Sequence, residues 1–581
     1  MVRRNLCYFL LMLMSSISEA ATPNIVLILA DDLGFTDIQP FASEISTPSL
    51  AALAENGIRF TNHHVAASCA PTRAMLLTGV DSHLNGVPNI PEAMPPSQLG
   101  RNGYDGVLSH QVQTVATLLR DRGYHTYVSG KWHLGKDSSR LPNQRGFERS
   151  VILAESGADN WSQRPYLPMY RAANWYKDDQ PHQLPEKFYS SEYIVDQAIE
   201  QIDSQHGDGQ AFFSYLAFQA VHIPVQAPAE FRVMYEAQYQ QGWSALRQQR
   251  YRAAVAAGLV SSSTTLLEMD STADWDALTE DEQRDWARRM AVYAAMVQAM
   301  DHHIGRFVEY LKSIGEYDNT VFVFMSDNGP EPADPVGQFG LPFVLWMKAM
   351  GYNTDYETLG EPDSYVVIGP SFASAAASPL SYYKYYAGEG GLRVPMIIAG
   401  AGVEPRGQLS SALTHVTDIV PTLLELGGAS MPGAQYRQPT GKSLLPLLLG
   451  QDDRVRQEHE TLGYELGGNA ALFKGDYKLV KNLPPAGDGR WHLYNIVDDP
   501  GESRDLAASL PERFAEMQAD YEDYAQRNGV LPVPDGYDQL QQVSWNSIMA
   551  RKAEWISVLL ALLVLIYVGV RWRRQRVRAQ S

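Results

Sequence analysis

Four apolar segments of this chain are each followed at once by polar side chains, and this repetition constrains the fold more than any other feature. The segments are continuous rather than alternating in hydropathy, which is typical of parallel strands buried on both faces. They are Asn24–Ala30, His125–Val128, Ala211–Phe218 and Val321–Met325. Because helix-like segments lie between them, the sequence predicts an α/β fold with a large mixed, mainly parallel sheet sandwiched by helices.

The polar residues after these segments include groups that metal binding and catalysis require. Ligands bind outside the carboxyl ends of the strands in an open parallel sheet, so we expect the four sets to meet at one edge. One group of polar residues after a strand would be an ordinary turn, whereas four such groups at one edge of the sheet predict a binding or catalytic site. The sets are Asp31-Asp32, Gly130-Lys131-Trp132-His133, Gln219-Ala220-Val221-His222 and Ser326-Asp327-Asn328-Gly329.

The segment around Cys69 is a candidate nucleophile site. Pro71 suits the first turn of a helix that continues through Ala74–Leu77, which places Cys69 at the helix N-terminus. Unpaired N–H groups and the helix dipole favour an anion there, and Arg73 can contact the same anion. Cysteine-based phosphatases place their arginine farther from the cysteine than the four positions seen here, which disfavours that class. A buried apolar cysteine is the plain alternative.

Asp31, Asp32 and Asp327, together with Asn328, form a set of oxygen donors. Three carboxylates suit a hard cation, and the lack of His or Cys in the set disfavours zinc. A helix N-cap would be the default interpretation of Asp31-Asp32 alone. The equivalent position of Asp327-Asn328 at another strand end favours a metal ion.

Positive charge for an anion pocket comes from Lys131, His133, His222 and Lys384. Taken singly, each lysine is more typical of a solvated surface and each histidine of the core. The net charge of −19 argues against nucleic acid as a partner. An anionic substrate therefore needs a local basic pocket.

The motif Cys69-x-Pro71-x-Arg73, extended to Thr78-Gly79, resembles the signature of the sulfatase family. The family more often has serine where this chain has Thr72. Gly130–Gly135 is similar to the family's second signature, and the similarity extends to about Val530. It is greatest to bacterial arylsulfatases of the alkaline-phosphatase superfamily.

This resemblance implies an alkaline-phosphatase-like fold and hydrolysis of sulfate esters by a formylglycine that a maturation enzyme makes from Cys69. It implies one Ca²⁺, since a histidine of the two-zinc phosphatases is replaced by Asn328. The implied metal ligands are Asp31, Asp32, Cys69, Asp327 and Asn328. The implied catalytic residues are Cys69, Arg73, Lys131, His133, His222 and Lys384.

The implied mechanism uses both hydroxyls of the aldehyde hydrate at position 69. One attacks sulfur while Lys131 and Lys384 bind the sulfuryl oxygens, and His222 protonates the departing alcohol. The other, with His133 as base, then expels sulfate. The alternatives are a phosphonate or phosphate ester hydrolase on the same scaffold and an inactive, membrane-tethered binding module.

Both ends of the chain carry apolar segments. Arg3-Arg4, Leu6–Met14 and Ser18-Glu19-Ala20 predict a signal peptide over 1–20, which would leave Cys69 as the one cysteine and exclude a disulfide framework. Trp555–Val570 carries no charge and predicts a transmembrane helix. The arginines that follow it predict an inner-membrane anchor with a periplasmic catalytic body; they are Arg571, Arg573, Arg574, Arg576 and Arg578.

The sequence therefore divides into six parts. They are a signal peptide (1–20), a catalytic domain (22–450), a smaller α+β lobe with an antiparallel sheet (451–535), a linker (536–554), a transmembrane helix (555–572) and a basic cytoplasmic tail (573–581). Residues 228–300 and 337–370 are insertions that could be lids, subunit contacts or packed helices. We expect structural roles for His63, His64, His302, His303 and His415.

Overall fold

A computed structural model describes residues 22–552 and, beyond them, 560, 563–564, 567–569 and 571–572. The predicted signal peptide lies outside the described residues, as do most of the predicted transmembrane helix and the tail. Among the helices that the structure describes, none combines the length and apolar character needed to cross a bilayer.

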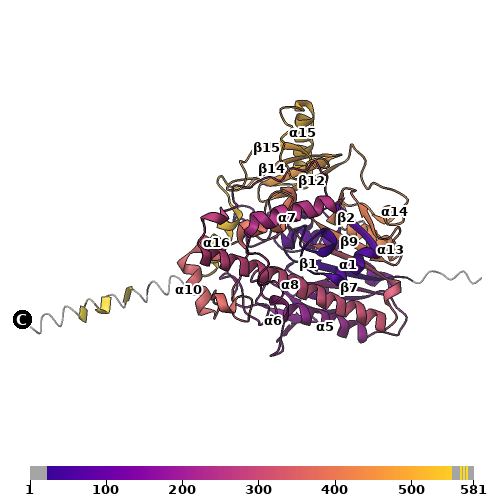
Figure 1. The fold of residues 1–581 in the computed structure, drawn as a ribbon. Coiled ribbons are helices and arrows are strands. Elements are labelled where there is room, and N and C mark those ends of the chain that lie inside the picture. Colours follow the sequence, from indigo (N-terminus) through magenta and orange to yellow (C-terminus); the bar gives the residue numbers. More distant parts are fainter. Residues whose placement is uncertain (1–21, 553–559, 561–562, 565–566, 570, 573–581) are drawn as a thin grey trace, which may run out of the picture.

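The main sheet has 11 strands among the described residues and forms the centre of the molecule (Figure 1). Its strands are β1 (Asn24–Ala30), β2 (Gly57–His64), β3 (His125–Lys131), β4 (Arg149–Leu153), β5 (Trp175–Lys177), β6 (Gln180–His182), β7 (Phe212–Ala217), β8 (Thr320–Ser326), β9 (Arg393–Gly400), β10 (Gln408–Ser410) and β11 (Thr414–His415). The order is β10-β2-β9-β8-β1-β7-β3-β4-β5-β6, with β11 beside β2. Neighbours from β8 to β4 are parallel, while β9 is antiparallel to β2 and β8. The predicted mixed, mainly parallel sheet is confirmed.

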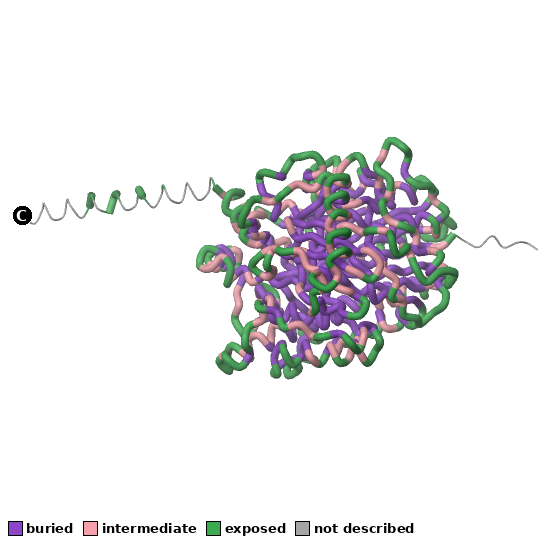
Figure 2. The backbone as a smooth tube through the Cα atoms, turned by 90° about the horizontal axis from the view of Figure 1, so that it is seen from above, coloured by how far each residue is buried: buried purple, intermediate pink, exposed green. Residues whose placement is uncertain are grey.

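Two groups of helices pack on this sheet. One contains α1 (Pro48–Glu55), α5 (Ser190–Asp203) and α8 (Glu280–Ser313), and the other contains α2 (Cys69–Thr78), α4 (Val115–Arg122) and α13 (Ile419–Leu426). All residues of β1 and β8 are buried. Buried backbone fills the centre of the molecule (Figure 2). Burial on both faces explains why the strands read as continuous apolar runs.

The first insertion is a packed helical region rather than a detached lid. It contains α6 (Ala229–Arg232), α7 (Gly242–Ala256) and the start of α8. Helix α8 begins at a capping box between Thr279 and Glu282, and its buried face extends from Ala287 to Leu311. The second insertion contains α9 (Pro335–Phe339), α10 (Leu341–Ala349) and the start of α11 (Gly369–Ala376).

The C-terminal lobe is a four-stranded antiparallel sheet covered by a helix. Its elements are β12 (Thr461–Leu466), β13 (Asn469–Lys474), β14 (Tyr477–Lys481), β15 (Trp491–Asn495) and α15 (Pro511–Asn528). Met517 and Tyr524 of α15 pack in one cluster with Leu472, Leu479 and Leu493 of the sheet. The segment predicted as a linker contains another helix, α16 (Gln539–Ala550), whose Gln539, Val543 and Ser547 are buried against the body.

Candidate active site

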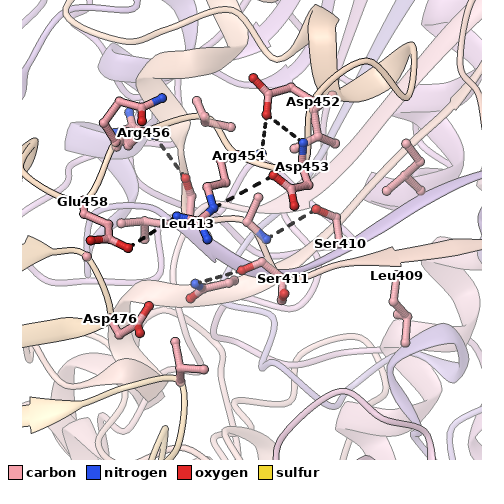
Figure 3. Close-up of a pocket in the computed structure, with 18 of the residues that line it drawn as sticks. Leu409, Ser410, Ser411, Leu413, Asp452, Asp453, Arg454, Arg456, Glu458 and Asp476 are labelled. Carbon is pink, nitrogen blue, oxygen red and sulfur yellow. Dashed lines mark hydrogen bonds and ion pairs between the residues drawn. The ribbon is translucent and has the colours of Figure 1, made fainter.

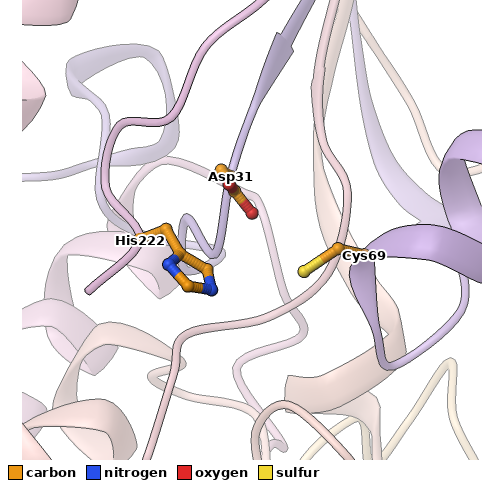
Figure 4. A group of neighbouring side chains, drawn as sticks. All are labelled: Asp31, Cys69 and His222. Carbon is orange, nitrogen blue, oxygen red and sulfur yellow. The ribbon is translucent and has the colours of Figure 1, made fainter. Parts of the chain in front are cut away.

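The carboxyl ends of four neighbouring parallel strands, β8, β1, β7 and β3, bring together the polar residues that follow them. The amide of Asp31, after β1, donates to the carbonyl of Ala220, after β7, at 2.8 Å. Asp31, Cys69 and His222 face one common point in Figure 4, with ligand atoms within 4.8 Å of one another. The structure thus brings the sets at the strand ends to one edge of the sheet.

Helix α2 holds the candidate nucleophile at its first residue. Cys69 is 2% exposed, and its Sγ lies 3.7 Å from Asp32 Oδ1. Burial raises the pKa of the Cys69 thiol, so the unmodified side chain is a neutral thiol at pH 7 and a poor nucleophile. One turn along, Arg73 is fully buried, and its Nε donates to Asp327 Oδ2 at 2.9 Å. The site therefore holds a guanidinium but no thiolate.

Buried oxygen donors form a compact group beside Cys69. Single ligand atoms of Asp31, Asp32, Cys69 and Asp327 all lie within 4.8 Å of one another. Asn328 joins them, since its Nδ2 donates to Asp32 Oδ1 at 2.7 Å while its buried Oδ1 has no hydrogen-bond partner. Burial raises the pKa of Asp31 to about 8 despite the nearby charge of Lys131, and the neighbouring carboxylate of Asp327 adds to the rise. Carboxylate and amide oxygens in this arrangement fit a hard divalent cation.

Two buried lysines supply positive charge next to these carboxylates. Lys131 Nζ donates to Asp31 Oδ2 at 2.6 Å, and Lys384 Nζ lies 2.8 Å from Asp32 Oδ1. Burial alone would lower the pKa of Lys131, but the neighbouring carboxylate of Asp31 raises it, so the ammonium stays charged. Lys384 belongs to the loop before α12 (Glu389–Leu392). The structure places both predicted lysines in the site.

The two predicted histidines have different partners. His222 Nδ1 lies 2.6 Å from the carbonyl oxygen of Ile223 and donates to it, so Nε2 remains directed at Asp32 Oδ2, 3.7 Å away. Burial and the nearby lysines lower the pKa of His222 well below its ordinary value. His133 Nε2 lies 3.2 Å from Glu92, and its buried Nδ1 has no hydrogen-bond partner. In its neutral form, each histidine thus has one unprotonated ring nitrogen, Nε2 of His222 and Nδ1 of His133.

Backbone strain concentrates at two of these residues. Asp32 and His133 have φ values of +63° and +56°, in the left-handed region that side chains other than glycine rarely adopt. Such conformations cost on the order of 1–3 kcal/mol and persist where surrounding contacts enforce them. Here they aim a carboxylate and an imidazole into the site.

Three further residues complete the site and were not predicted from the sequence. Glu92 accepts from His133 and from the hydroxyl of Tyr170. Glu331 Oε2 lies 2.7 Å from Lys384 Nζ. The ring of Tyr166 packs edge-on against His222, with centroids 5.0 Å apart. Glu331 could have been found three residues after Asn328, whereas Glu92 carries no signal in its local sequence.

The remaining histidines that we expected to be structural have partners elsewhere. His64 Nε2 lies 3.1 Å from Glu389, which also contacts Lys478 of the C-terminal lobe at 2.9 Å. His63 pairs with Thr414, His303 with Arg306 and His415 with Thr417, whereas His302 is exposed.

A surface pocket of about 530 Å³ lies between β10 and the C-terminal lobe and shares no residue with the strand-end site (Figure 3). Its arginines already have acidic partners. Arg456 lies 2.6 Å from Asp418, and Arg454 lies 3.6 Å from Glu458. The buried positive charge suited to an anion therefore belongs to the strand ends.

Comparison with known proteins gives a consistent result. The sulfatase family model matches residues 23–429. An uncharacterised sulfatase of Schizosaccharomyces pombe is 36% identical over 544 residues, which cover 90% of this chain and 96% of that protein. The arylsulfatase of Klebsiella aerogenes is 33% identical over 434 residues, covering 74% and 91%. The structure of Ps i-CgsB with k-i-k-neocarrahexaose shares the fold, with a TM-score of 0.63, 24% identity and coverage of 92% and 99%.

Proposed function

Because this chain belongs to the sulfatase family and is a sulfuric ester hydrolase, we propose that its nucleophile is a formylglycine hydrate made from Cys69 by a maturation enzyme. The observation that carries this proposal is the state of Cys69. Its thiol is buried and neutral, yet it lies between Asp32 and the helix turn that holds Arg73. A hydrate has two hydroxyl oxygens that such a site can activate, whereas burial raises the pKa of the thiol and so disfavours its ionisation.

One Ca²⁺ is the ion that the donor set fits. Asp31, Asp32, Asp327, the free Oδ1 of Asn328 and a hydroxyl oxygen at position 69 would hold it. When bound, the ion supplies positive charge for the sulfuryl oxygens and lowers the pKa of a hydroxyl bound to it. It would also relieve the repulsion among the buried carboxylates.

The protein's own residues divide the first half of the reaction among them. Lys131 and Lys384 bind the sulfuryl oxygens and stabilise the charge that builds on them. Arg73 and Asp327 orient the attacking hydroxyl of residue 69, whose oxygen forms the new bond to sulfur while its proton passes to the carboxylate of Asp327. The bound anionic ester favours the doubly protonated, charged form of His222. As the bond from sulfur to the ester oxygen breaks, this form donates its Nε2 proton to the departing alcohol and keeps its Nδ1 proton on the carbonyl oxygen of Ile223.

The second half releases sulfate. His133 accepts the proton of the remaining hydroxyl through Nδ1, because Nε2 is already engaged by Glu92. The carbon–oxygen double bond of the aldehyde forms while the bond from that carbon to the sulfate oxygen breaks. Water then adds to the aldehyde to restore the hydrate.

We also propose a location for the enzyme. The apolar segment Trp555–Val570, followed by arginines, indicates one C-terminal span in the inner membrane with the catalytic body in the periplasm. The signal peptide proposed for 1–20 would direct export.

The test is turnover by protein co-expressed with a maturation enzyme. Mass spectrometry of the peptide containing residue 69 should show an aldehyde, and active protein with only unmodified thiol would contradict the proposal. Relative kcat/KM on sulfate and phosphate esters of one phenol separates sulfatase chemistry from the phosphate or phosphonate ester alternative. Loss of turnover on all esters by aldehyde-bearing protein would favour an inactive binding module.

A further inference from the structure

Helices α10 and α16 lie on the same side of the molecule (Figure 1), and each has exposed apolar side chains. Leu341 and Leu345 of α10 are 67% and 59% exposed, while Trp545 and Ile548 of α16 are 55% and 53% exposed. Met549 extends the second set. The spacings of three and four residues put each set on one helix face. Apolar side chains gathered in this way mark a surface that another apolar phase covers.

The C-terminal ends of both helices are hydrogen-bonded to one segment, residues 164–170. Arg164 donates to the carbonyl oxygen of Met350, at the end of α10, at 3.1 Å. Arg551, at the end of α16, donates to the carbonyl oxygens of Pro168 and Tyr170. The C-terminal ends of α10 and α16 therefore both contact residues 164–170, and we call the exposed sides of these two helices together the α10/α16 face.

The inner side of the same segment contacts the active site. Tyr166 packs against His222, and the hydroxyl of Tyr170 donates to Glu92, the partner of His133. One segment of chain thus separates the α10/α16 face from the histidine that protonates the leaving alcohol. In a displacement at sulfur the alcohol departs on the side opposite the nucleophile, and the proposed role of His222 as proton donor puts the departing oxygen next to its ring. The alcohol part of the ester therefore extends from sulfur towards residues 164–170.

The continuation of the chain identifies what covers this face. Helix α16 ends at Ala550, and the uncharged segment Trp555–Val570 begins five residues later. Five extended residues reach at most about 17 Å, so the end of α16 must lie close to the bilayer if that segment spans it. Trp545, with its amphipathic indole, is a residue type that favours the membrane interface.

We propose that the α10/α16 face rests on the lipid bilayer and that the enzyme acts on sulfate esters of amphiphilic alcohols held in that bilayer. This inference rests on the proposed function and narrows its substrate class. The sulfate group enters the strand-end site, while the long-chain or polycyclic alcohol stays near the membrane interface beside residues 164–170. The single span keeps the enzyme at the membrane, and the α10/α16 face sets its orientation there.

The experiment uses the full chain in vesicles of phosphatidylethanolamine and phosphatidylglycerol. Wild type is compared with a variant carrying both Leu345→Gln and Trp545→Gln, and with the control Met431→Gln, whose side chain is 51% exposed after α13. Each is assayed with hexadecyl sulfate in the vesicles and with soluble 4-nitrophenyl sulfate. We expect the double variant to lose about tenfold or more on hexadecyl sulfate, while 4-nitrophenyl sulfate turnover stays within about twofold.

A second measurement tests whether the α10/α16 face contacts lipid, and it does not depend on enzyme activity. Leu345→Cys, Trp545→Cys and Met431→Cys are labelled in turn with an environment-sensitive fluorophore and exposed to spin-labelled lipid. Quenching at 345 and 545 but not at 431 supports the proposal. Equal quenching of the three labels by spin-labelled lipid would overturn the proposal. So would unchanged turnover of hexadecyl sulfate by the double variant, or protection of the labels at 345 and 545 by a second copy of the chain in detergent. If the wild-type protein were inactive on both esters, the proposed function would be wrong instead. The quenching experiment would still show whether the α10/α16 face contacts the bilayer.

Discussion

The guanidinium of Arg73 contacts one oxygen of Asp327 twice, with Nε and Nη2 lying 2.9 Å and 2.7 Å from Oδ2. Its Nη1 donates to the carbonyl oxygen of Lys131 at 2.9 Å. Three strand and helix ends are thereby tied together by one planar group: the start of α2, the end of β8 and the end of β3. A group with a single nitrogen cannot make all of these contacts.

Arg73→Lys is therefore expected to lower kcat/KM on 4-nitrophenyl sulfate about 100-fold or more, the scale of losing one preorganised electrostatic contact. A lysine ammonium keeps the charge but cannot bond Asp327 and the Lys131 carbonyl in the same geometry. The measurement is steady-state kinetics beside circular dichroism, with exposed Arg454→Lys as the control. A kcat/KM within tenfold of wild type would show that charge alone suffices.

Removal of the bound cation should lower thermal stability as well as activity. Without it, the carboxylates of Asp31, Asp32 and Asp327 stay buried with Lys131, Lys384 and Arg73 as their neighbouring counter-charges. At Ca²⁺ about a hundredfold above its dissociation constant, the stabilisation should be about 2.7 kcal/mol. We expect chelation to lower the melting temperature and Ca²⁺ to restore it, measured by scanning calorimetry.

Two variants make that experiment specific. Asp327→Asn should abolish the Ca²⁺-dependent shift, whereas Asp476→Asn, an exposed residue in the turn between β13 and β14, should retain it. Elemental analysis accompanies both. Full activity after exhaustive chelation would contradict the metal assignment, and stoichiometric zinc would point towards the phosphatases.

The C-terminal lobe should dock in a pH-dependent way through His83. Its Nε2 lies 2.8 Å from Glu465 of β12, and its Nδ1 lies 3.4 Å from Asp81. Burial would lower its pKa, but hydrogen bonds and charge from Asp81 and Glu465 raise it to about 9. Because the folded pKa exceeds the ordinary value of about 6.5, the stabilisation is fully present below pH 6.5 and is lost as pH rises through 9.

We expect His83→Gln to remove up to about 3 kcal/mol of unfolding free energy at pH 6 but little at pH 9.5. Denaturant unfolding at several pH values, with Ca²⁺ held constant, measures the difference. Exposed His459→Gln is the control. A loss that is the same at every pH would mean that His83 acts by packing rather than by charge.

The sequence allowed the sheet and most of the site to be predicted because local patterns encode both. Apolar runs mark the strands, and parallel pairing then forces the residues after them, such as Asp31 and Asp327, to one edge. Glu92 could not be predicted, because it reaches His133 from 41 positions away through a loop without periodicity. The packing of α16 was also missed, since its contacts with residues 168–170 join segments more than 380 positions apart.

The proposed topology predicts that truncation before Trp555 releases a soluble, active enzyme, because α16 ends at Ala550 and the body keeps all its packed elements. The full chain should sediment with the inner membrane, and protease added to intact spheroplasts should digest its catalytic body. Immunoblotting of both fractions checks this. Protection of the body in intact spheroplasts would place it in the cytoplasm and contradict the arginine-based orientation.

Cys69→Ser separates the two halves of the proposed reaction. A serine hydroxyl can still be oriented by Arg73 and Asp327, so sulfate transfer to the enzyme should survive at a reduced rate. The second half should fail, because expulsion of sulfate needs a second hydroxyl on the same carbon, and serine has only one. The variant should therefore release about one equivalent of alcohol per enzyme and stop, as expected when a covalent intermediate cannot break down.

Mass spectrometry after the burst should find a sulfate ester on the introduced serine, and stopped-flow absorbance with 4-nitrophenyl sulfate should give the burst size. Cys69→Ala, which has no hydroxyl, is the matched control and should show neither burst nor sulfate adduct. Steady turnover of Cys69→Ser near the wild-type rate would show that hydrolysis does not depend on an aldehyde hydrate. The mechanism assigned to Cys69 would then be wrong. The reaction could still be hydrolysis of sulfate esters, because the remaining site residues could activate a water molecule to attack sulfur directly.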